Sequence, residues 1–262
     1  MNEKKVVWIT GASSGIGEAL VYEYASLHYN IILSARNTEK LTAIANSIKD
    51  RTGTAILPLD LNELDAMETK AEKAFNCFGR IDILINNAGI SQRSLITETS
   101  LAVYEKLMRV NYLGTVALTK ALLPYYINQK HGTIGVVTSL MGKFASPYRS
   151  GYCGAKHALH GFFDALRLEH QKDGISVTLI CPGFVATSIA KNALIGSGQK
   201  QGTDDKATSE GLAPELAARK IRVGLQKKKF EIYIGGKELL GIYLKRFFPK
   251  LLHRLVLKST VR

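Results

Sequence analysis

The amino-acid sequence predicts an α/β fold built on a doubly wound parallel sheet of about seven strands, with helices on both faces. Two observations support this prediction. Short apolar runs alternate with segments of helical spacing as far as about residue 236. Each run is continuously apolar, as strands are when helices cover both faces of a parallel sheet. Because crossovers between parallel strands are right-handed, the alternation indicates a doubly wound sheet.

The elements follow one another in a regular order, with turn residues between them. In the first half of the chain we expect strands at residues 6–9, 31–35, 55–59 and 81–85, and helices at residues 18–27, 37–49 and 62–78, the last capped by Asn62. In the second half we expect a long helix from Ser100 to about residue 126, a strand at 132–138, a helix at 153–170, a strand at 175–180, a helix at 214–226 and a short strand at 230–234.

The chain contains no internal repeat, so we expect one domain over residues 1–236 and an extension over residues 237–262. Residues 184–213 are glycine-rich and have weak periodicity, which is unusual inside a compact domain. We interpret them as a substrate lid, with a short helix at 184–194 over the pocket and later glycines as the hinge. A plain surface loop is the alternative.

The charge of the chain is concentrated at one end. Residues 220–262 hold twelve lysines and arginines against two acids, so they carry +10 of the formal net charge of +13. A nucleic-acid-binding protein is often basic throughout, so this distribution argues against nucleic acid as a partner. The three cysteines form no CxxC pair, which indicates a reduced, cytoplasmic protein. No secretory signal and no apolar run of membrane-spanning length is evident.

The turn TGASSGIG at residues 10–17 joins the first strand to the first helix. The free N–H groups at a helix N-terminus bind phosphate, and the absent Cβ of glycine allows close approach. Gly11 suits the sharp turn, Gly15 the approach of a cofactor, and Gly17 the packing of the helix on the sheet. This context predicts a dinucleotide cradle. A plain Gly/Ser-rich turn is the alternative.

The residues that follow the second and third strands indicate which dinucleotide binds. Arg36 stands where an acidic residue would bind a ribose 2′-hydroxyl. A guanidinium suits a 2′-phosphate, so we expect NADP(H) in preference to NAD(H). A solvated loop arginine is the other interpretation. Asp60 and Leu61 end the third strand near the expected adenine, although a turn or capping role for Asp60 is an equal alternative.

Tyr152 and Lys156 are four residues apart on a predicted helix, so their side chains share a face. A neighbouring cation stabilises phenolate and makes a tyrosine usable as an acid and base. Ser139, at the end of the fifth strand, is placed to hydrogen-bond the same reacting oxygen. Asn111 lies inside a helix, where asparagine is mildly unfavourable. Ordinary helix packing, a turn serine and an exposed asparagine are the alternatives.

Taken together, TGASSGIG, the NNAG of residues 86–89, Asn111, Ser139, the YxxxK of Tyr152 and Lys156, and Pro182-Gly183 resemble the short-chain dehydrogenase/reductase family over residues 5 to about 187. The resemblance implies a Rossmann-type fold, a nicotinamide cofactor and carbonyl–alcohol interconversion. It implies that Tyr152 acts as acid and base, that Lys156 binds the ribose and lowers the tyrosine pKa, that Ser139 steadies the substrate oxygen and that Asn111 holds a relay water. The implied cofactor-binding residues are Gly11, Ser13, Ser14, Gly15, Ile16, Gly17, Arg36, Asp60, Leu61, Asn87, Ala88, Gly89, Tyr152, Lys156, Pro182, Gly183, Val185 and Thr187.

Other kinds of site are less well supported. His157 and His160 lie three residues apart, but no third ligand is evident, so we expect no metal. Ser139 lacks the GxSxG context of a hydrolase nucleophile. Two further classes of function stay open. One is a non-catalytic regulatory protein that keeps the dinucleotide pocket, and the other is a membrane-surface scaffold.

The extension contains the amphipathic stretch ELLGIYLKRFFPKLLHRLVL at residues 238–257, which Pro249 is expected to divide into two short helices. A basic and apolar helix is typical of an interface with anionic lipid. A helix that closes the substrate cleft or packs on a partner subunit is an equal alternative. By analogy with tails on family members that reduce lipid or steroid carbonyls, the extension favours an apolar substrate. We expect a homodimer or homotetramer.

Overall fold

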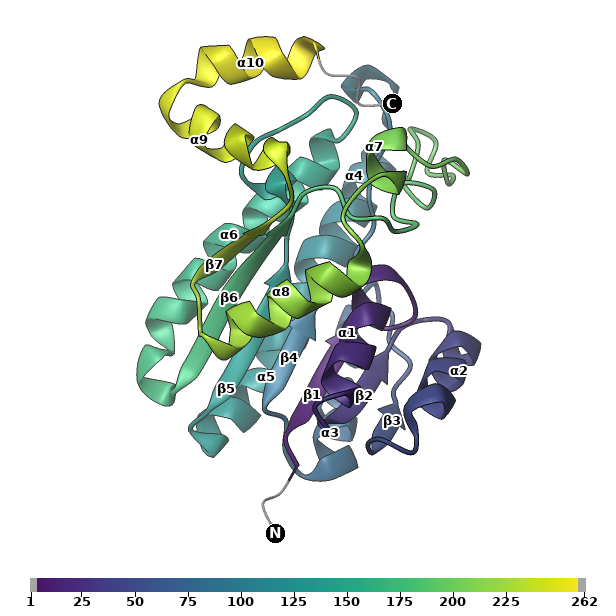
Figure 1. Cartoon of the computed structure of the whole chain (residues 1–262), viewed down its shortest axis with the longest axis vertical. Coiled ribbons are helices and arrows are strands. Elements are labelled where there is room, and N and C mark those ends of the chain that lie inside the picture. The colour runs from purple at the N-terminus through teal and green to yellow at the C-terminus, as the bar shows by residue number, and fades with distance from the viewer. Residues whose placement is uncertain (1–3, 259–262) are drawn as a thin grey trace.

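A single parallel sheet of seven strands organises the molecule, in the order β3-β2-β1-β4-β5-β6-β7 (Figure 1). This computed structural model describes residues 4–258. Val7 of β1 is paired with Ile31 on one side and with Ile83 on the other, so β1 is an interior strand of the sheet. The strands are β1 (Val6–Thr10), β2 (Asn30–Ser34), β3 (Thr54–Ile56), β4 (Ile83–Asn86), β5 (Gly132–Val137), β6 (Ile175–Pro182) and β7 (Glu231–Ile234).

Helices connect the strands and cover both faces of the sheet, as predicted. The α-helices are α1 (Gly15–Ala25), α2 (Thr38–Ile48), α3 (Met67–Phe78), α4 (Leu101–Met108), α5 (Gly114–Gln129), α6 (Ser150–Glu169), α7 (Lys206–Ser209), α8 (Pro214–Gln226), α9 (Leu240–Phe247) and α10 (Pro249–Lys258). Short 3₁₀ turns lie at Leu64–Ala66, Ile96–Glu98, Leu140–Gly142, Gln171–Asp173 and Lys237–Leu239.

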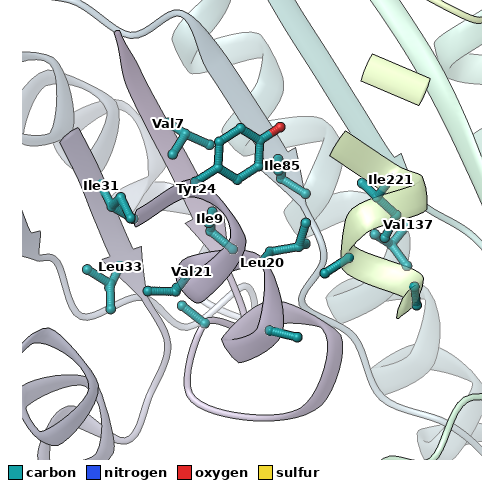
Figure 2. Packing of buried hydrophobic residues seen from close by; sticks show 14 of the residues in the cluster. Val7, Ile9, Leu20, Val21, Tyr24, Ile31, Leu33, Ile85, Val137 and Ile221 are labelled. Carbon is teal, nitrogen blue, oxygen red and sulfur yellow. The ribbon is translucent and has the colours of Figure 1, made fainter. Parts of the chain in front are cut away.

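Two apolar layers hold the helices on the sheet. Side chains of α1, α2 and α8 pack on one face, and those of α3, α5 and α6 on the other. Figure 2 shows part of the first layer, where Tyr24 and Leu20 of α1 lie over Ile9 of β1, with Ile221 of α8 beside them. Alternate residues of β1 point to opposite faces, which places Trp8 in the second layer. The continuous apolar pattern of the strands is explained by this double coverage.

The helix predicted at residues 62–78 begins later than expected. A 3₁₀ turn at Leu64–Ala66 precedes α3, and Asn62 is not its cap. The Asn62 N–H instead donates to Oδ1 of Asp60, at 2.9 Å, so Asp60 closes the turn that leaves the third strand. The expected capping role of Asn62 was therefore wrong, because Asn62 lies in the turn closed by Asp60, before the helical residues begin.

The long helix predicted from Ser100 contains an interruption. It consists of α4, a π-helical turn at Arg109–Leu113, and α5, and the Ser100 side chain makes no capping hydrogen bond. A π turn inserts one extra residue into a helix and is frequent at functional sites. The inserted turn contains Asn111, which is buried.

Residues 184–213 leave the carboxyl end of β6 and contain little regular structure. The short helix expected at 184–194 was wrong, since this stretch forms turns. The backbone N–H and C=O of Leu194 bond to Ser91 and Arg93, so the chain there follows a neighbouring loop and does not continue as a helix. Gly198 and Gly202 have φ angles of 86° and 81°, the positive values that glycine tolerates.

The C-terminal stretch forms two helices that meet at Pro249, as predicted. They lie above the carboxyl ends of the strands, at the end of the molecule opposite the start of β1 (Figure 1). Leu252 of α10 is buried against Leu140 and Phe144, and Leu244 of α9 is partly buried in the same cluster. Within residues 4–258, no helix combines the length and the apolar character needed to cross a bilayer.

Candidate active site

The glycine turn between β1 and α1 has little space around it. Gly11 and Gly15 have φ angles of 66° and 56°, which only glycine adopts without strain. A Cβ at Gly15 would lie 2.8 Å from the Thr187 side chain, and a Cβ at Gly17 would lie 2.1 Å from the Gly11 carbonyl oxygen. Gly11 and Gly15 are therefore needed for the backbone conformation of the turn. Gly15 and Gly17 are also needed because neighbouring atoms leave no room for a Cβ. The Ser14 side chain makes no capping bond to the first turn of α1.

Thr10 connects this turn to the loop that leaves β4. Its hydroxyl oxygen accepts hydrogen bonds from the N–H groups of Asn87 and Ala88, both at 3.0 Å, and its O–H donates to the carbonyl of Ile85. The Asn87 side-chain amide donates back to the Thr10 carbonyl at 3.0 Å. Sequence reasoning missed Thr10, although it is the first residue of the TGASSGIG motif.

A cleft of about 420 Å³ opens beside these two loops at the carboxyl ends of β1, β2 and β4. Most of the predicted cofactor-binding residues line it. They are Gly11, Ser13, Ser14, Gly15, Ile16, Arg36, Asp60, Leu61, Asn87, Ala88, Gly89, Tyr152, Lys156 and Thr187. Gly17 is buried behind the glycine turn and does not line the cleft.

A second cavity of about 420 Å³ adjoins the cleft, and Tyr152 lines both. Four predicted site residues lie on this side, namely Ser139, Pro182, Gly183 and Val185. Phe144 and the α9 and α10 residues Leu244 and Leu252 form much of its apolar wall. The structure thus brings the phenol to the border between the cleft beside the glycine turn and a more apolar cavity.

Tyr152 and Lys156 lie in the first turns of α6 and are both buried. The Lys156 Nζ atom donates a hydrogen bond to the Val137 carbonyl at 2.8 Å. At the end of β5, Ser139 Oγ accepts from the Met141 N–H at 3.1 Å. The Ser139 hydroxyl donates to the Pro182 carbonyl at 3.4 Å, and Ser139 lines the same cavity as Tyr152. Serine, tyrosine and lysine are therefore assembled at one place, as the motif spacing predicted.

The protonation of these groups is set mainly by burial. Burial raises the pKa of Tyr152 above its usual value, while the polar Ser139 side chain and the charges of Arg149 and Arg93 act in the opposite direction. Burial also lowers the pKa of Lys156 to about 8. At neutral pH the site thus holds a neutral phenol beside a lysine that is close to losing its proton.

Asn111 lies behind this group, inside the π turn. Its Oδ1 accepts from the Ile90 N–H at 2.8 Å, and its Nδ2 donates to the Ile90 carbonyl at 2.9 Å. Oδ1 would also lie 2.9 Å from a Cβ at Gly89, which leaves no room for a side chain there. Asn111 does not line either cavity, so the structure places it as the support of the NNAG loop.

Arg93, Arg149 and Asp205 form a buried charged group that sequence reasoning missed. Both arginines line the second cavity, and Arg93 is paired with Asp205 at 2.5 Å. Arg93 and Asp205 are 112 residues apart, and neither lies in a motif, so no local signal in the sequence links them.

The two histidines considered as metal ligands lie in different surroundings. His157 Nδ1 hydrogen-bonds the Cys153 carbonyl, whereas His160 lies close to Cys181 and Glu231. These three side chains offer potential ligand atoms within 4.8 Å of one another, an arrangement that the sequence did not reveal. However, the ammonium of Lys143 lies 2.5 Å from the Glu231 carboxylate, and this cation opposes a metal ion at the same oxygen.

Comparison with known proteins assigns the arrangement to a family. A family model described as short chain dehydrogenase matches residues 5–196. Dehydrogenase/reductase SDR family member 7 of Homo sapiens is 41% identical over 252 residues, which cover 93% of this chain and 74% of that protein. Dehydrogenase/reductase SDR family member 7B of Bos taurus is 37% identical over 259 residues, with 96% and 80% covered.

Solved structures agree with this assignment. An alcohol dehydrogenase from Thermococcus sibiricus, complexed with 5-hydroxy-NADP, has a TM-score of 0.77 and 26% identity, and the match covers 90% of this chain and 97% of that one. A short chain dehydrogenase/reductase from Burkholderia phymatum, in complex with NAD, has a TM-score of 0.85 at 22% identity, with 96% of each chain covered, and it supports the fold.

Proposed function

This chain belongs to the short-chain dehydrogenase/reductase family of oxidoreductases, and we propose that it interconverts a carbonyl group and a secondary alcohol with NADP(H). One observation carries the proposal. Tyr152, which shares one cavity with Ser139, lies where a cleft lined by the glycine turn meets a separate, largely apolar cavity. A cofactor in the first space and a substrate in the second would meet at its hydroxyl.

The residues of the cleft fit a dinucleotide. The N-terminus of α1 faces it, and Gly11 and Gly15 keep that end free of side-chain atoms. We assign the nicotinamide ribose to Lys156, which lines the same cleft. When bound, the cofactor supplies or accepts the hydride. These residues supply only its position.

The preference for NADP rests on charge. Arg36 follows β2 at the border of the cleft and is exposed, so its guanidinium is free to meet a 2′-phosphate. Among the described residues that line the cleft, Asp60 is the one carboxylate, and its Oδ1 already accepts the Asn62 N–H. The similar Thermococcus sibiricus enzyme was solved with 5-hydroxy-NADP, which is consistent with this preference.

In the reduction, the carbonyl carbon gains a hydride and the carbonyl oxygen gains a proton. We assign the proton to the Tyr152 hydroxyl, since burial keeps it neutral and therefore able to donate. Ser139 is placed to hydrogen-bond the same oxygen and to hold it against the phenol. In the oxidation, Tyr152 takes the proton from the alcohol. We assign the stabilisation of the transient phenolate to Lys156, whose ammonium lies 5.7 Å from the centre of the Tyr152 ring.

The substrate is proposed to be mainly apolar. Leu140, Phe144, Leu244 and Leu252 lie on the wall of the second cavity, and α9 and α10 close one side of it. Of the two interpretations of the C-terminal extension, closure of the substrate cleft is supported by this contact. Apolar walls bind apolar substrate surface and exclude water from the reaction.

The test is to assay a panel of carbonyl compounds and to monitor each reaction by the absorbance of NADPH at its nicotinamide band. The same assays are repeated with NADH. We expect oxidation of NADPH by at least one apolar ketone or aldehyde, and little turnover with Tyr152→Phe. A protein that binds NADPH tightly and turns over no member of an acyclic, cyclic and steroid panel in either direction would support the regulatory alternative instead.

We also propose peripheral contact of α9 and α10 with anionic lipid. Tyr243, Phe247, Phe248 and Leu257 are more than half exposed, and lysines and arginines lie between them. Exposed apolar and basic side chains together favour an anionic membrane surface. Sedimentation with phosphatidylserine vesicles, compared with phosphatidylcholine vesicles, tests the contact. Light scattering tests whether a homodimer or homotetramer covers these helices instead.

A further inference from the structure

The second cavity contains a charge imbalance next to the reacting hydroxyl. Arg93 and Arg149 both line it, and they are 3% and 5% exposed. A single carboxylate, that of Asp205, forms ion pairs with both guanidinium groups. Burial raises the pKa of Asp205, but hydrogen bonds and charge from Arg93 more than offset this, so its pKa lies below the usual value and it is ionised. The group therefore carries a net charge of +1.

The two arginines are not equally well paired. The Arg93 Nε and Nη2 atoms donate to Asp205 at 2.8 and 2.5 Å, and Nη1 donates to Ser91 and to the Gln92 carbonyl. Every nitrogen of Arg93 thus has a partner.

Arg149 makes longer bonds. Its Nη2 lies 3.4 Å from Asp205 and its Nη1 lies 3.2 Å from the Ser146 hydroxyl, while its buried Nε has no hydrogen-bond partner. Burial, followed by the charge of Arg93, lowers the pKa of Arg149 to about 10, so it is still a cation at neutral pH. A buried cation with an unpaired donor is costly unless an anion joins it.

Among the described residues that line the cavity, no other side chain balances the +1 charge of Arg93, Arg149 and Asp205. The remaining charged residues that line it are Lys237 and Glu238, which offset one another. Glu238 is engaged elsewhere, since its Oε1 accepts the Phe184 N–H at 3.3 Å.

Arg149 is the N-cap residue of α6, three positions before Tyr152, so an anion bound to it would lie close to the reacting oxygen.

We propose that the cavity binds an oxo acid, or the corresponding hydroxy acid, whose carboxylate pairs with Arg149 while its apolar chain extends along α9 and α10. One carboxylate neutralises the net charge of the arginine group. The apolar chain matches the wall formed by Leu244 and Leu252. This inference rests on the proposed function for the reaction, but the binding of the carboxylate does not depend on turnover.

The first experiment measures binding without chemistry. Decanoate and its neutral analogue decanamide are titrated by calorimetry into the full-length protein saturated with NADP. Decanoate is expected to bind at least about tenfold more tightly, the effect of one charge-assisted hydrogen bond. Arg149→Gln should abolish that preference, and Arg149→Lys, which keeps the charge, should retain part of it.

The matched control is Arg167→Gln, which removes an arginine from the same helix. Arg167 is paired with Asp164 and does not line the cavity, so the preference for decanoate should persist in this variant. Circular dichroism melting of each variant confirms folding. Equal binding of decanoate and decanamide by the native protein, or a preference that survives in a folded Arg149→Gln protein, overturns the proposal. So does Arg149-dependent binding of decyl phosphate with no binding of decanoate.

The second experiment uses turnover. The kcat/KM values for 2-oxodecanoate and 4-oxodecanoate are each compared with those of their methyl esters. At least one acid should exceed its ester by about tenfold or more, and Arg149→Gln should reduce that ratio. Turnover of the esters that equals or exceeds that of the acids rejects the carboxylate site but leaves the oxidoreductase intact. Arg149-dependent binding of decanoate without turnover of any compound rejects the reaction but leaves the site intact.

Discussion

The ammonium nitrogen of Lys156 lies 5.7 Å from the centre of the Tyr152 ring, because the two residues are one helical turn apart on α6. The hydrogen bond from Lys156 to Val137 holds the ammonium on the β5 side, and both side chains are buried. Two groups whose charges depend on pH thus share one enclosed space. This relationship makes Tyr152 the first residue to test.

Tyr152→Phe should reduce kcat by about a hundredfold or more, the usual contribution of a general acid, while the affinity for NADPH changes by no more than a few-fold. Only the hydroxyl is lost, and the ring can keep its packing. Stopped-flow kinetics give kcat, and quenching of NADPH fluorescence gives the affinity. Full activity in this variant would remove Tyr152 from the reaction.

Arg36→Asp should weaken NADPH binding by roughly tenfold or more and leave NADH binding much less affected, through loss of a charge-assisted bond and new repulsion of the 2′-phosphate. Fluorescence titration with both cofactors measures the two affinities. Arg51→Asp is the matched control, since Arg51 is also exposed and does not line the cleft. Parallel losses for both cofactors would show that Arg36 does not select between them.

Gly17→Ala should destabilise the protein by about 2 kcal/mol or more, because the new Cβ would lie 2.1 Å from the Gly11 carbonyl oxygen, far inside normal contact. Gly161→Ala is the control. Gly161 is on α6 with nothing within 4 Å of a new Cβ, so alanine there should stabilise by about 0.5–1 kcal/mol. Urea denaturation measures both changes. Equal effects of the two substitutions would contradict the close packing of the glycine turn.

The stability should also fall as the pH drops from 6.5 towards about 4, in part through His160. Burial, followed by the charge of Lys143, lowers the pKa of His160 to about 4, although Glu231 and Asp164 act in the opposite direction. The unfolded chain binds this proton from its ordinary pKa of 6.5, so in that interval the unfolded state holds more protons and is favoured by acid.

The free energy of unfolding, measured by urea denaturation across this interval, should depend less steeply on pH in His160→Gln than in the native protein. His157→Gln, on the same helix, should keep the native slope. Unchanged slopes in both variants would show that His160 titrates normally in the folded state.

Residues 184–213 are predicted to act as a lid whose closed form is stabilised by ligands. Trypsin cleavage near Lys200 and Lys206, two exposed lysines, should slow markedly when NADP and a substrate analogue are added. Electrophoresis of timed digests measures the rate, with cleavage at the exposed Lys172, outside the segment, as the internal control. Equal rates with and without ligands would identify the segment as a surface loop.

The sequence was most informative where chemistry needs a local pattern. The glycine turn and the Tyr152–Lys156 pair each lie within a few residues, so their spacing was enough to predict them, while the role of the NNAG loop came from the family resemblance. The division of the C-terminal helix at Pro249 was predicted for the same reason, because the effect of proline on a helix is local.

What the sequence could not predict depends on contacts between distant segments. The ion pair of Arg93 with Asp205 joins residues 112 positions apart, and no periodicity marks it. The turns at 184–194 replaced an expected helix because Leu194 bonds to the chain at Ser91 and Arg93, a contact that outweighs local apolar spacing. The hydrogen bonding of Asn111 to Ile90 likewise depends on a π turn, which no residue pattern in the sequence predicted.

The helices α9 and α10 lie outside residues 5–196, the part that the family model matches, and yet they form one wall of the cavity beside Tyr152. Tyr152 and the cavity wall formed by α9 and α10 are therefore encoded in separate parts of the chain. Substitutions at Leu244 or Leu252 can reshape what the protein accepts without disturbing the phenol, the ammonium or the glycine turn. Under the proposed function, α9 and α10 would select the substrate, whereas the chemistry would belong to residues within the part that the family model matches.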